Sequence, residues 1–383
     1  MIPLTKNTIS NGEIDKLIDW LKTYPRLTKG DLTLEFEKNW SEYIDMEYSI
    51  FVNSGSSANL LMIYYLIESG MIKRGDKIVV PALSWATSLA PVVQFGLQPI
   101  LCDCNLDNLS IDIDHFSQLI KEHNPKALVL VSILGLVPNM NEIQDLCNKN
   151  DIILLEDTCE SLGSEFNNKK LGSFGLMSTF STYFGHHMST IEGGVICTND
   201  KKVGNILKSI RSHGWGRDMD LDFSTELKNK YNIDEFNALY TFYYNGFNVR
   251  PTDLQAFLGI GQLKGIPDVV TKRNDNYNIF RKSIDDKFWK PKENKDNFIS
   301  NMAYPVISEN RESIINNLKN NGVECRPLLS GSLSRQPYWY ENFGKISLKN
   351  ADFIHDNGLY VPNNHEISTD EIEKICKAIN EAN

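Results

Sequence analysis

Short apolar runs alternate with segments of helical pattern through the first two-thirds of the chain. The apolar runs occupy residues 78–80, 98–103, 127–131, 152–155, 179–181 and 194–198, and helix-like stretches such as 58–68 and 140–148 lie between them. Buried runs rich in branched residues and separated by helices predict a mostly parallel sheet covered by helices on both faces. In such α/β sheets, ligands bind at the carboxyl ends of the strands.

The pattern changes in the last third of the chain. Residues 261–271 are expected to form a hinge into a long helix, followed by a strand (301–309), a helix (311–321), a strand (322–327) and a closing helix (369–382). We therefore predict two domains, a large α/β domain over residues 1–265 and a smaller α+β C-terminal domain over residues 266–383.

Composition narrows the classes of function. A chain of 383 residues that is 41% hydrophobic can bury a large core. Its 39 basic and 49 acidic residues give a net charge of −10, and no long basic run appears, so nucleic acid is not an expected partner. No window approaches the ~18 apolar residues of a membrane helix, and the N-terminus has no signal-peptide pattern. We expect a protein without membrane spans.

The seven cysteines indicate a reduced compartment. Their spacing fits no disulfide framework, which favours the cytoplasm. Cys102 and Cys104 form the one close pair, and because no second pair accompanies them we predict no metal site.

Small hydroxyl residues precede the first strongly apolar helix. Gly55, Ser56 and Ser57 stand where its first turn is expected, and free N–H groups at a helix N-terminus attract anions. The alternative is an ordinary capping sequence. Trp85 follows the next strand, where it would either stack on a planar ligand or belong to the core.

Acidic residues follow the fourth strand. Asp157 ends it, within the run Glu-Asp-Thr-Cys-Glu-Ser-Leu-Gly over residues 156–163, which also contains Glu160. Further along lie Ser181, His186 and Glu-Gly-Gly at 192–194, and then Gly-Phe-Asn-Val-Arg at 246–250.

Together these motifs, in this order, resemble the DegT/DnrJ/StrS family of sugar aminotransferases, which are fold-type I enzymes that use pyridoxal phosphate (PLP). In that family a lysine before the Gly-Gly holds PLP, and the matching residue here is His186. The resemblance implies a phosphate-binding turn at Gly55, Ser56 and Ser57, a phosphate contact from Ser181, stacking by Trp85 and an Asp157 carboxylate at the pyridine nitrogen. It places Glu160, where relatives usually carry Gln or His, near the cofactor's phenolic oxygen and His186; a simple surface ion pair is the alternative.

Three further residues concern substrate and assembly. The resemblance implies that Asn248 reaches the phosphate of a neighbouring subunit, and hence a homodimer with shared active sites. Arg250 would bind a carboxylate or a nucleotide phosphate, or else form a structural ion pair. Arg326 resembles a substrate-side element of the small domain.

Histidine in place of lysine changes the expected chemistry. Imidazole cannot tether PLP, so PLP or pyridoxamine phosphate (PMP) would be bound non-covalently, but with an ordinary pKa near 6.5 it can move protons. This arrangement resembles that of the nucleotide-sugar 3-dehydratases. The resemblance implies removal of the C3 hydroxyl from a 4-keto-6-deoxyhexose, regeneration of PMP by L-glutamate and release of ammonia. GDP-4-keto-6-deoxy-D-mannose, the precursor in colitose and O-antigen lipopolysaccharide biosynthesis, is the favoured substrate.

A related group acts on CDP-sugars with an iron–sulfur cluster. After Cys197 only Cys325 and Cys376 remain, too few for cluster ligation there, so the GDP-linked reading is favoured. Two alternatives stay open: the same chemistry on another nucleotide sugar, such as a GDP-linked heptose, and a non-catalytic sensor of sugar or cofactor. Sequence alone leaves open the base, the sugar stereochemistry, the end product, any higher oligomer and the part of Glu160 in proton transfer.

Overall fold

A seven-stranded sheet forms the centre of the computed structural model, which describes residues 1–292 and 294–382. In spatial order its strands are β1 (Tyr48–Val52), β9 (Gly194–Thr198), β8 (Met177–Ser181), β5 (Ile153–Asp157), β4 (Ala127–Val131), β2 (Lys77–Pro81) and β3 (Gln98–Cys102). Strand β9 runs antiparallel to both of its neighbours, β1 and β8, and all other neighbouring pairs in this sheet are parallel. The predicted α/β class and mostly parallel sheet are confirmed, and β1 is an edge strand that the pattern did not predict.

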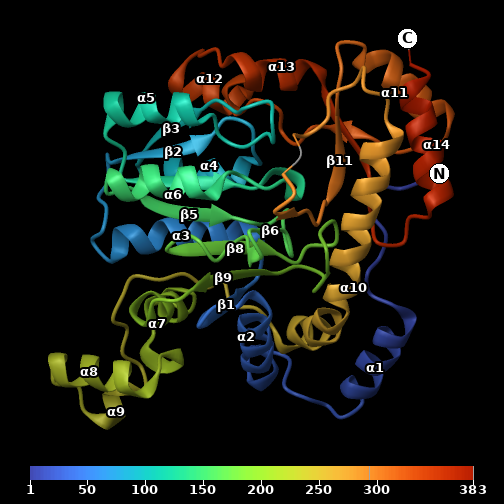
Figure 1. Ribbon diagram of the computed structural model, residues 1–383. Coiled ribbons are helices and arrows are strands. Elements are labelled where there is room, and N and C mark those ends of the chain that lie inside the picture. Colours follow the sequence, from blue (N-terminus) through green and yellow to red (C-terminus); the bar gives the residue numbers. More distant parts are fainter. Residues whose placement is uncertain (293, 383) are drawn as a thin grey trace.

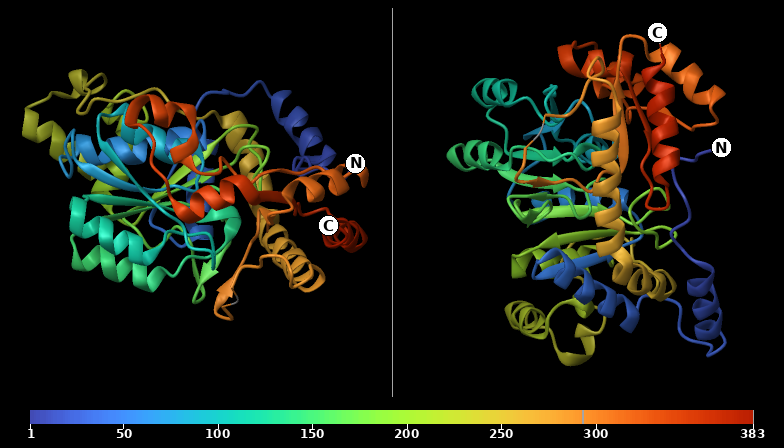
Figure 2. Two further views of the ribbon diagram at one scale, coloured as in Figure 1. Left: turned by 90° about the horizontal axis from the view of Figure 1, so that it is seen from above. Right: turned by 45° about the vertical axis from the view of Figure 1, so that its right-hand side comes forward.

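Both faces of the sheet are covered by helices, as Figure 2 shows. One face carries α3 (Gly55–Glu68), α4 (Ala86–Gln94) and α7 (Lys201–Ile210), and the other carries α5 (Ile113–His123) and α6 (Met140–Lys149). In β4, Val129 belongs to the first core and Leu128 and Leu130 to the second. Successive side chains of a strand point to opposite faces, so a strand covered on both faces must be apolar throughout.

A third core lies under α2 (Asp31–Ile44) and α10 (Asp253–Ser283), beside β1, β8 and β9. Trp40 packs edge-on against Phe180, with ring centroids 5.4 Å apart. The hinge expected at 261–271 is not a break, because α10 continues through Pro267. The helix instead changes direction along its length (Figure 1), which is the usual effect of a proline within a helix.

The last part of the chain builds a small sheet of β11 (Ala303–Ile307), β13 (Gly358–Pro362) and β12 (Arg326–Pro327). Helices α11 (Arg311–Asn320) and α14 (Thr369–Asn380) accompany it (Figure 1), and their order confirms the predicted strand–helix–strand and closing helix. The central strand β13 was not predicted. The predicted domain boundary at 265 falls inside α10, so the two-domain division stays a prediction; residues 293 and 383 of its second part lie outside the described residues.

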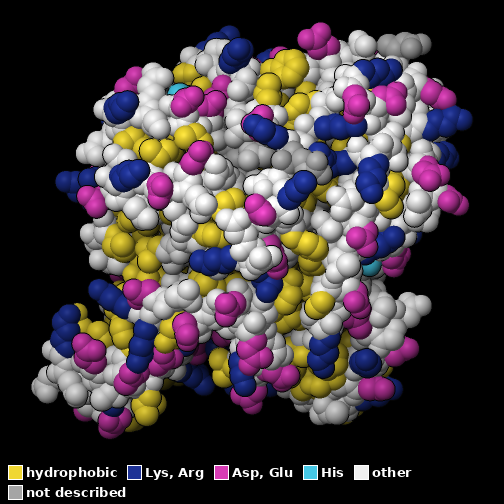
Figure 3. All heavy atoms as spheres, viewed as in Figure 1, with side chains coloured by type: hydrophobic (Ala, Val, Ile, Leu, Met, Phe, Trp, Pro, Cys, Tyr) yellow, Lys and Arg dark blue, Asp and Glu magenta, His cyan; other side chains and the backbone are white. Residues whose placement is uncertain are grey.

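Two helices, α8 (Leu221–Tyr231) and α9 (Glu235–Ala238), project from the body of the molecule (Figure 1). Figure 3 shows apolar side chains among the charged ones on this projection. The remaining α-helices are α1 (Asn11–Leu21), α12 (Pro337–Phe343) and α13 (Lys349–Asn357), and a small sheet is formed by β10 (Asn297–Phe298), β6 (Glu165–Phe166) and β7 (Lys169–Lys170). Within the described part of the chain, no helix has the length and apolar character needed to cross a membrane.

Candidate active site

A cavity of about 570 Å³ opens between the carboxyl ends of the central strands and the small sheet. Eight of the eleven predicted site residues line it: Gly55, Ser56, Trp85, Asp157, Glu160, Ser181, His186 and Arg326. Gly55 and Ser56 begin α3 shortly after β1, and Trp85 follows β2. Asp157 and Ser181 end β5 and β8, Glu160 and His186 follow those two strands, and Arg326 stands on β12. A parallel sheet brings these strand ends to one edge, so motifs far apart in the sequence meet there.

The first turn of α3 forms one wall of the cavity and is packed very closely. A Cβ on Gly55 would lie 2.7 Å from Ser181 Cβ, and one on Gly194 would lie 2.4 Å from the Ser54 carbonyl oxygen. These glycines are therefore required by the approach of helix to strand. The Ser57 N–H donates to Ser54 Oγ at 3.1 Å, so Ser57 takes part in the cap and does not line the cavity, whereas the Gly55 and Ser56 N–H groups begin the helix beside it.

Asp157 is held by a buried hydrogen-bond network. Its Oδ2 accepts from Ser88 Oγ at 2.7 Å and from Asn59 Nδ2 at 2.8 Å, and Asn59 Oδ1 accepts from Thr179 Oγ1 at 2.6 Å. These neutral donors fix the carboxylate at the cavity floor, where it can attract a positively charged group of a ligand. Sequence reasoning missed Ser88 and Asn59, which are buried polar residues of α4 and α3.

His186 lies in the loop between β8 and β9 and faces the cavity. Burial lowers the pKa of its imidazole to about 4, against an opposing contribution from Asp157. Its buried Nδ1 has no hydrogen-bond partner among the described residues. The side chain is therefore a neutral base at neutral pH that faces the cavity.

The pKa of Glu160 is shifted in the opposite direction from that of His186. Burial raises the pKa of its carboxyl to about 8, with a further contribution from Asp157, although the Leu134 N–H donates to its Oε2 at 2.8 Å. The surface ion pair considered for Glu160 is excluded, because the side chain is buried at the cavity wall. At neutral pH the cavity thus holds a neutral base and a protonated acid, a separation typical of acid–base sites.

Trp85 is 55% exposed although it lines the cavity, which excludes the alternative of a core tryptophan. Tyr183 and Tyr360 also line the cavity, and neither was predicted. Tyr183 lies close to His186 in a T-shaped arrangement, with ring centroids 6.4 Å apart. The cavity therefore offers several aromatic faces to a planar ligand.

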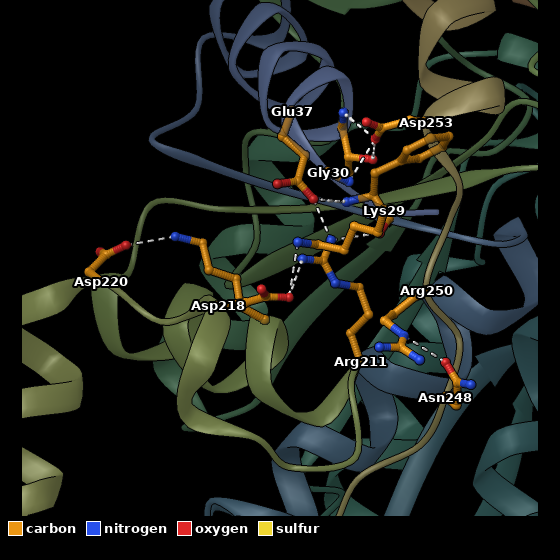
Figure 4. Close-up of polar contacts among 12 residues, drawn as sticks. Lys29, Gly30, Glu37, Arg211, Asp218, Asp220, Asn248, Arg250 and Asp253 are labelled. Atoms are coloured by element: carbon orange, nitrogen blue, oxygen red, sulfur yellow. Dashed lines mark hydrogen bonds and ion pairs between the residues drawn. The ribbon is translucent and has the colours of Figure 1, made fainter. Parts of the chain in front are cut away.

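Asn248 and Arg250 do not line the cavity of their own chain. Asn248 is exposed, and its Oδ1 accepts from Arg250 Nε at 3.0 Å (Figure 4). The Asn53 N–H, just before the first turn of α3, donates to the Val249 carbonyl at 3.0 Å. The segment thus runs beside the cavity wall while these two side chains meet each other outside it.

A buried ion pair supports this segment. The Arg211 guanidinium contacts the Glu37 carboxylate and donates to the Phe51 carbonyl at 2.8 Å, and it lies 3.5 Å from Asp218 (Figure 4). The Arg211 carbonyl accepts from the Val249 N–H at 3.1 Å. Arg211 therefore joins α2, β1 and the segment that carries Asn248.

The fold and the site define a PLP-type aminotransferase architecture, and comparison with known proteins agrees. The chain belongs to the DegT/DnrJ/EryC1/StrS aminotransferase family, whose model matches residues 8–380. It is 34% identical over 388 residues to the GDP-4-keto-6-deoxy-D-mannose 3-dehydratase of Escherichia coli O55:H7, with 98% of this chain and 99% of the relative covered.

Solved structures of related proteins have the same fold. A crystal structure of GDP-4-keto-6-deoxymannose-3-dehydratase with a trapped PLP-glutamate geminal diamine superposes with a TM-score of 0.90 at 32% identity, covering 99% of this chain and 100% of that one. A histidine-to-asparagine variant of that enzyme with bound GDP-perosamine superposes with a TM-score of 0.89 at 32% identity and the same coverage.

Proposed function

We propose that the protein is a PLP/PMP-dependent nucleotide-sugar 3-dehydratase that acts on GDP-4-keto-6-deoxy-D-mannose. The C3 hydroxyl would be replaced by hydrogen, while L-glutamate is converted to 2-oxoglutarate and ammonia. Atoms and electrons balance, because the two electrons that reduce C3 come from glutamate. The relatives at about one-third identity over nearly the whole chain support this reaction, and solved relatives carry PLP-glutamate or GDP-perosamine.

The cavity residues fit the cofactor. Gly55 and Ser56 N–H groups and the Ser181 hydroxyl would hold its phosphate, Trp85 would cover the ring, and Asp157 would keep the pyridine nitrogen protonated. When bound, PMP supplies an amine that condenses with the C4 carbonyl and a ring that accepts an electron pair, which allows the C3 hydroxyl to leave.

His186 is the residue that carries the proposal. A lysine at this place would tether the cofactor, whereas a neutral imidazole that faces the cavity cannot form that link but can accept and return a proton. We assign it removal of the proton that releases the electron pair and protonation of the departing C3 oxygen. Its lowered pKa keeps the base unprotonated at neutral pH.

Glu160 supports this step from the same wall. Because burial raises its pKa to about 8, it is protonated at neutral pH and can donate a hydrogen bond into the cavity. We assign it the contact with the cofactor's phenolic oxygen. A protonated carboxyl there avoids the repulsion that a second carboxylate beside Asp157 would cause.

The test combines the purified protein with PLP, L-glutamate and one 4-ketosugar nucleotide at a time. With GDP-4-keto-6-deoxy-D-mannose we expect deoxysugar, 2-oxoglutarate and ammonia in equal amounts. His186→Asn should lose about 10²–10⁴-fold in rate, the usual contribution of a positioned base. His123→Asn, on the far end of α5, is the matched control. Turnover of another nucleotide sugar alone would reassign the substrate, and no turnover at all would support a sensor.

We also propose a homodimer with shared sites. Asn248 is exposed and outside its own cavity, although the family motif makes it a phosphate contact, so a second copy would receive it. The projecting helix α9 and the residues just after it add exposed apolar area, with Phe236 81% and Tyr240 75% exposed. Such area on a monomer marks an interaction surface. The cytoplasm is the proposed location, in line with seven free cysteines.

Mixing two inactive variants tests the shared site. In a dimer of Asn248→Ala with His186→Asn subunits, one site would be intact and the other doubly damaged, so activity should return in part. Mixed dimers that form but stay inactive would place Asn248 in its own subunit's chemistry. A monomer at assay concentration by light scattering would remove the proposal altogether.

A further inference from the structure

One cation faces the cavity. Among the described residues that line it, Arg326 is the only lysine or arginine, against four carboxylic acids: Asp157, Glu160, Glu192 and Glu324. Arg326 stands on β12, and its side chain is 60% exposed. A long, exposed arginine samples many rotamers, so its use as an anion receptor depends on what orients it.

Glu324 provides that orientation. It stands two residues before Arg326, and its Oε1 accepts from Arg326 Nη2. Its other oxygen, Oε2, accepts from the Leu4 N–H at 3.0 Å. With both oxygens engaged and its side chain 27% exposed, Glu324 is itself fixed, and it leaves the other guanidinium donors of Arg326 to the cavity.

The N-terminal segment completes the arrangement. Residues 2–4 lie beside Val323, with the Ile2 N–H donating to the Gly322 carbonyl at 2.7 Å and the Glu324 N–H to the Ile2 carbonyl at 3.0 Å. Leu4 and Thr5 form part of the cavity wall. A second contact anchors the segment, because Lys6 forms an ion pair with Glu366 at 3.4 Å. Glu366 does not line the cavity.

We propose that Glu324 is a positioning residue that sets Arg326 for the carboxylate of the amino donor. The inference rests on the proposed function, which requires a dicarboxylate and a nucleotide sugar to use one cavity in turn. A guanidinium held at one edge presents its remaining N–H groups as a fork for a carboxylate. Without Glu324, each binding event must also order the arginine side chain.

Glu324→Gln tests this, because the amide keeps the size and can still accept from the Leu4 N–H but no longer carries the charge that holds Arg326. The affinity for glutarate, a dicarboxylate without an amine, is measured by NMR titration of the PLP-loaded protein. The apparent KM for L-glutamate is measured in the half-reaction without sugar. The dissociation constant of glutarate and the apparent KM for L-glutamate should both rise about tenfold, which is the order expected for ordering one long side chain.

Glu366→Gln is the matched control. It loosens the same N-terminal segment without touching Arg326, so it should leave both values within about twofold. Single-turnover reaction of the PMP form with the nucleotide sugar should change little in Glu366→Gln, because Glu366 does not line the cavity. Unchanged or tighter glutarate binding by Glu324→Gln would overturn the positioning role, as would equal losses in both variants. If the wild type shows no glutamate half-reaction, the proposed function fails, while glutarate binding still decides the role of Glu324.

Discussion

Replacing Glu160 with glutamine is expected to stabilise the cofactor-free protein, and increasingly so as the pH rises. Burial holds the pKa of this carboxyl at about 8, against an ordinary value of 4.5. The folded state therefore binds the proton more tightly than the unfolded state. Stability from this group is complete below pH 4.5 and is lost as the pH rises from there through 8.

The magnitude follows from the size of the shift. At about 1.4 kcal/mol per pH unit, the raised pKa of Glu160 lowers the stability by about 1 kcal/mol at pH 5.5, about 3 at pH 7 and about 5 above pH 8, because the unfolded chain ionises at a lower pH than the folded protein. Glutamine is neutral at every pH and can still accept the Leu134 N–H, so the variant avoids this cost. His186 has the opposite pH dependence, because its lowered pKa costs stability as the pH falls from 6.5 to about 4. This effect is the same in the variant and the wild type, so it cancels in their difference.

Melting temperatures from pH 5.5 to 9 measure the difference between variant and wild type. The variant should gain several degrees between these limits, since 1 kcal/mol moves the midpoint of a chain this large by about 2 °C or less. Glu341→Gln, at an exposed position, is the matched control and should change the melting temperature only slightly, because solvent screens an exposed charge. A pH-independent gain, or a loss of stability at pH 9, would refute the assignment of a protonated buried acid.

Three further predictions follow from other parts of the structure. After borohydride treatment the wild type should carry no covalently attached cofactor, whereas His186→Lys should gain a Schiff-base absorbance and a link that borohydride reduces. A pyridoxyl-lysine peptide from the wild type would contradict the assignment of His186 to the lysine position. Arg211→Met should destabilise by about 3–5 kcal/mol in thermal unfolding, because Glu37 is left buried and unpaired, and Glu37→Leu in the same chain should restore much of it. Ile191 has a φ of 72° and is 49% exposed, so Ile191→Gly should raise the melting point by relieving about 1 kcal/mol of backbone strain, whereas Ile191→Ala should not.

Local patterns were sufficient for much of the central architecture. The six predicted strands are present because a strand buried on both faces must be apolar along its length, a property that can be read from adjacent residues. The motif residues at strand ends converge for a similar reason, since a parallel sheet aligns those ends. Eight of the eleven predicted residues accordingly line one cavity.

What the pattern missed depends on contacts between distant parts of the chain. Strand β1 exists through antiparallel pairing with β9, and β13 is central because β11 and β12 pair with its two sides. A hinge was predicted at 261–271, but packing of α10 against α2 and α14 maintains the helix through it. Tertiary packing overrides local propensity at such places.

The identity of the chemical groups at the site came from the sequence, but their state came only from the fold. A histidine at 186 and a glutamate at 160 are plain in the printed chain, whereas their pKa values of about 4 and about 8 arise from burial by residues from many segments. The contact between Leu4 and Glu324 joins positions 320 residues apart. Spacing along a chain carries no information on such neighbours, because desolvation and long-range hydrogen bonds exist only once the chain has folded.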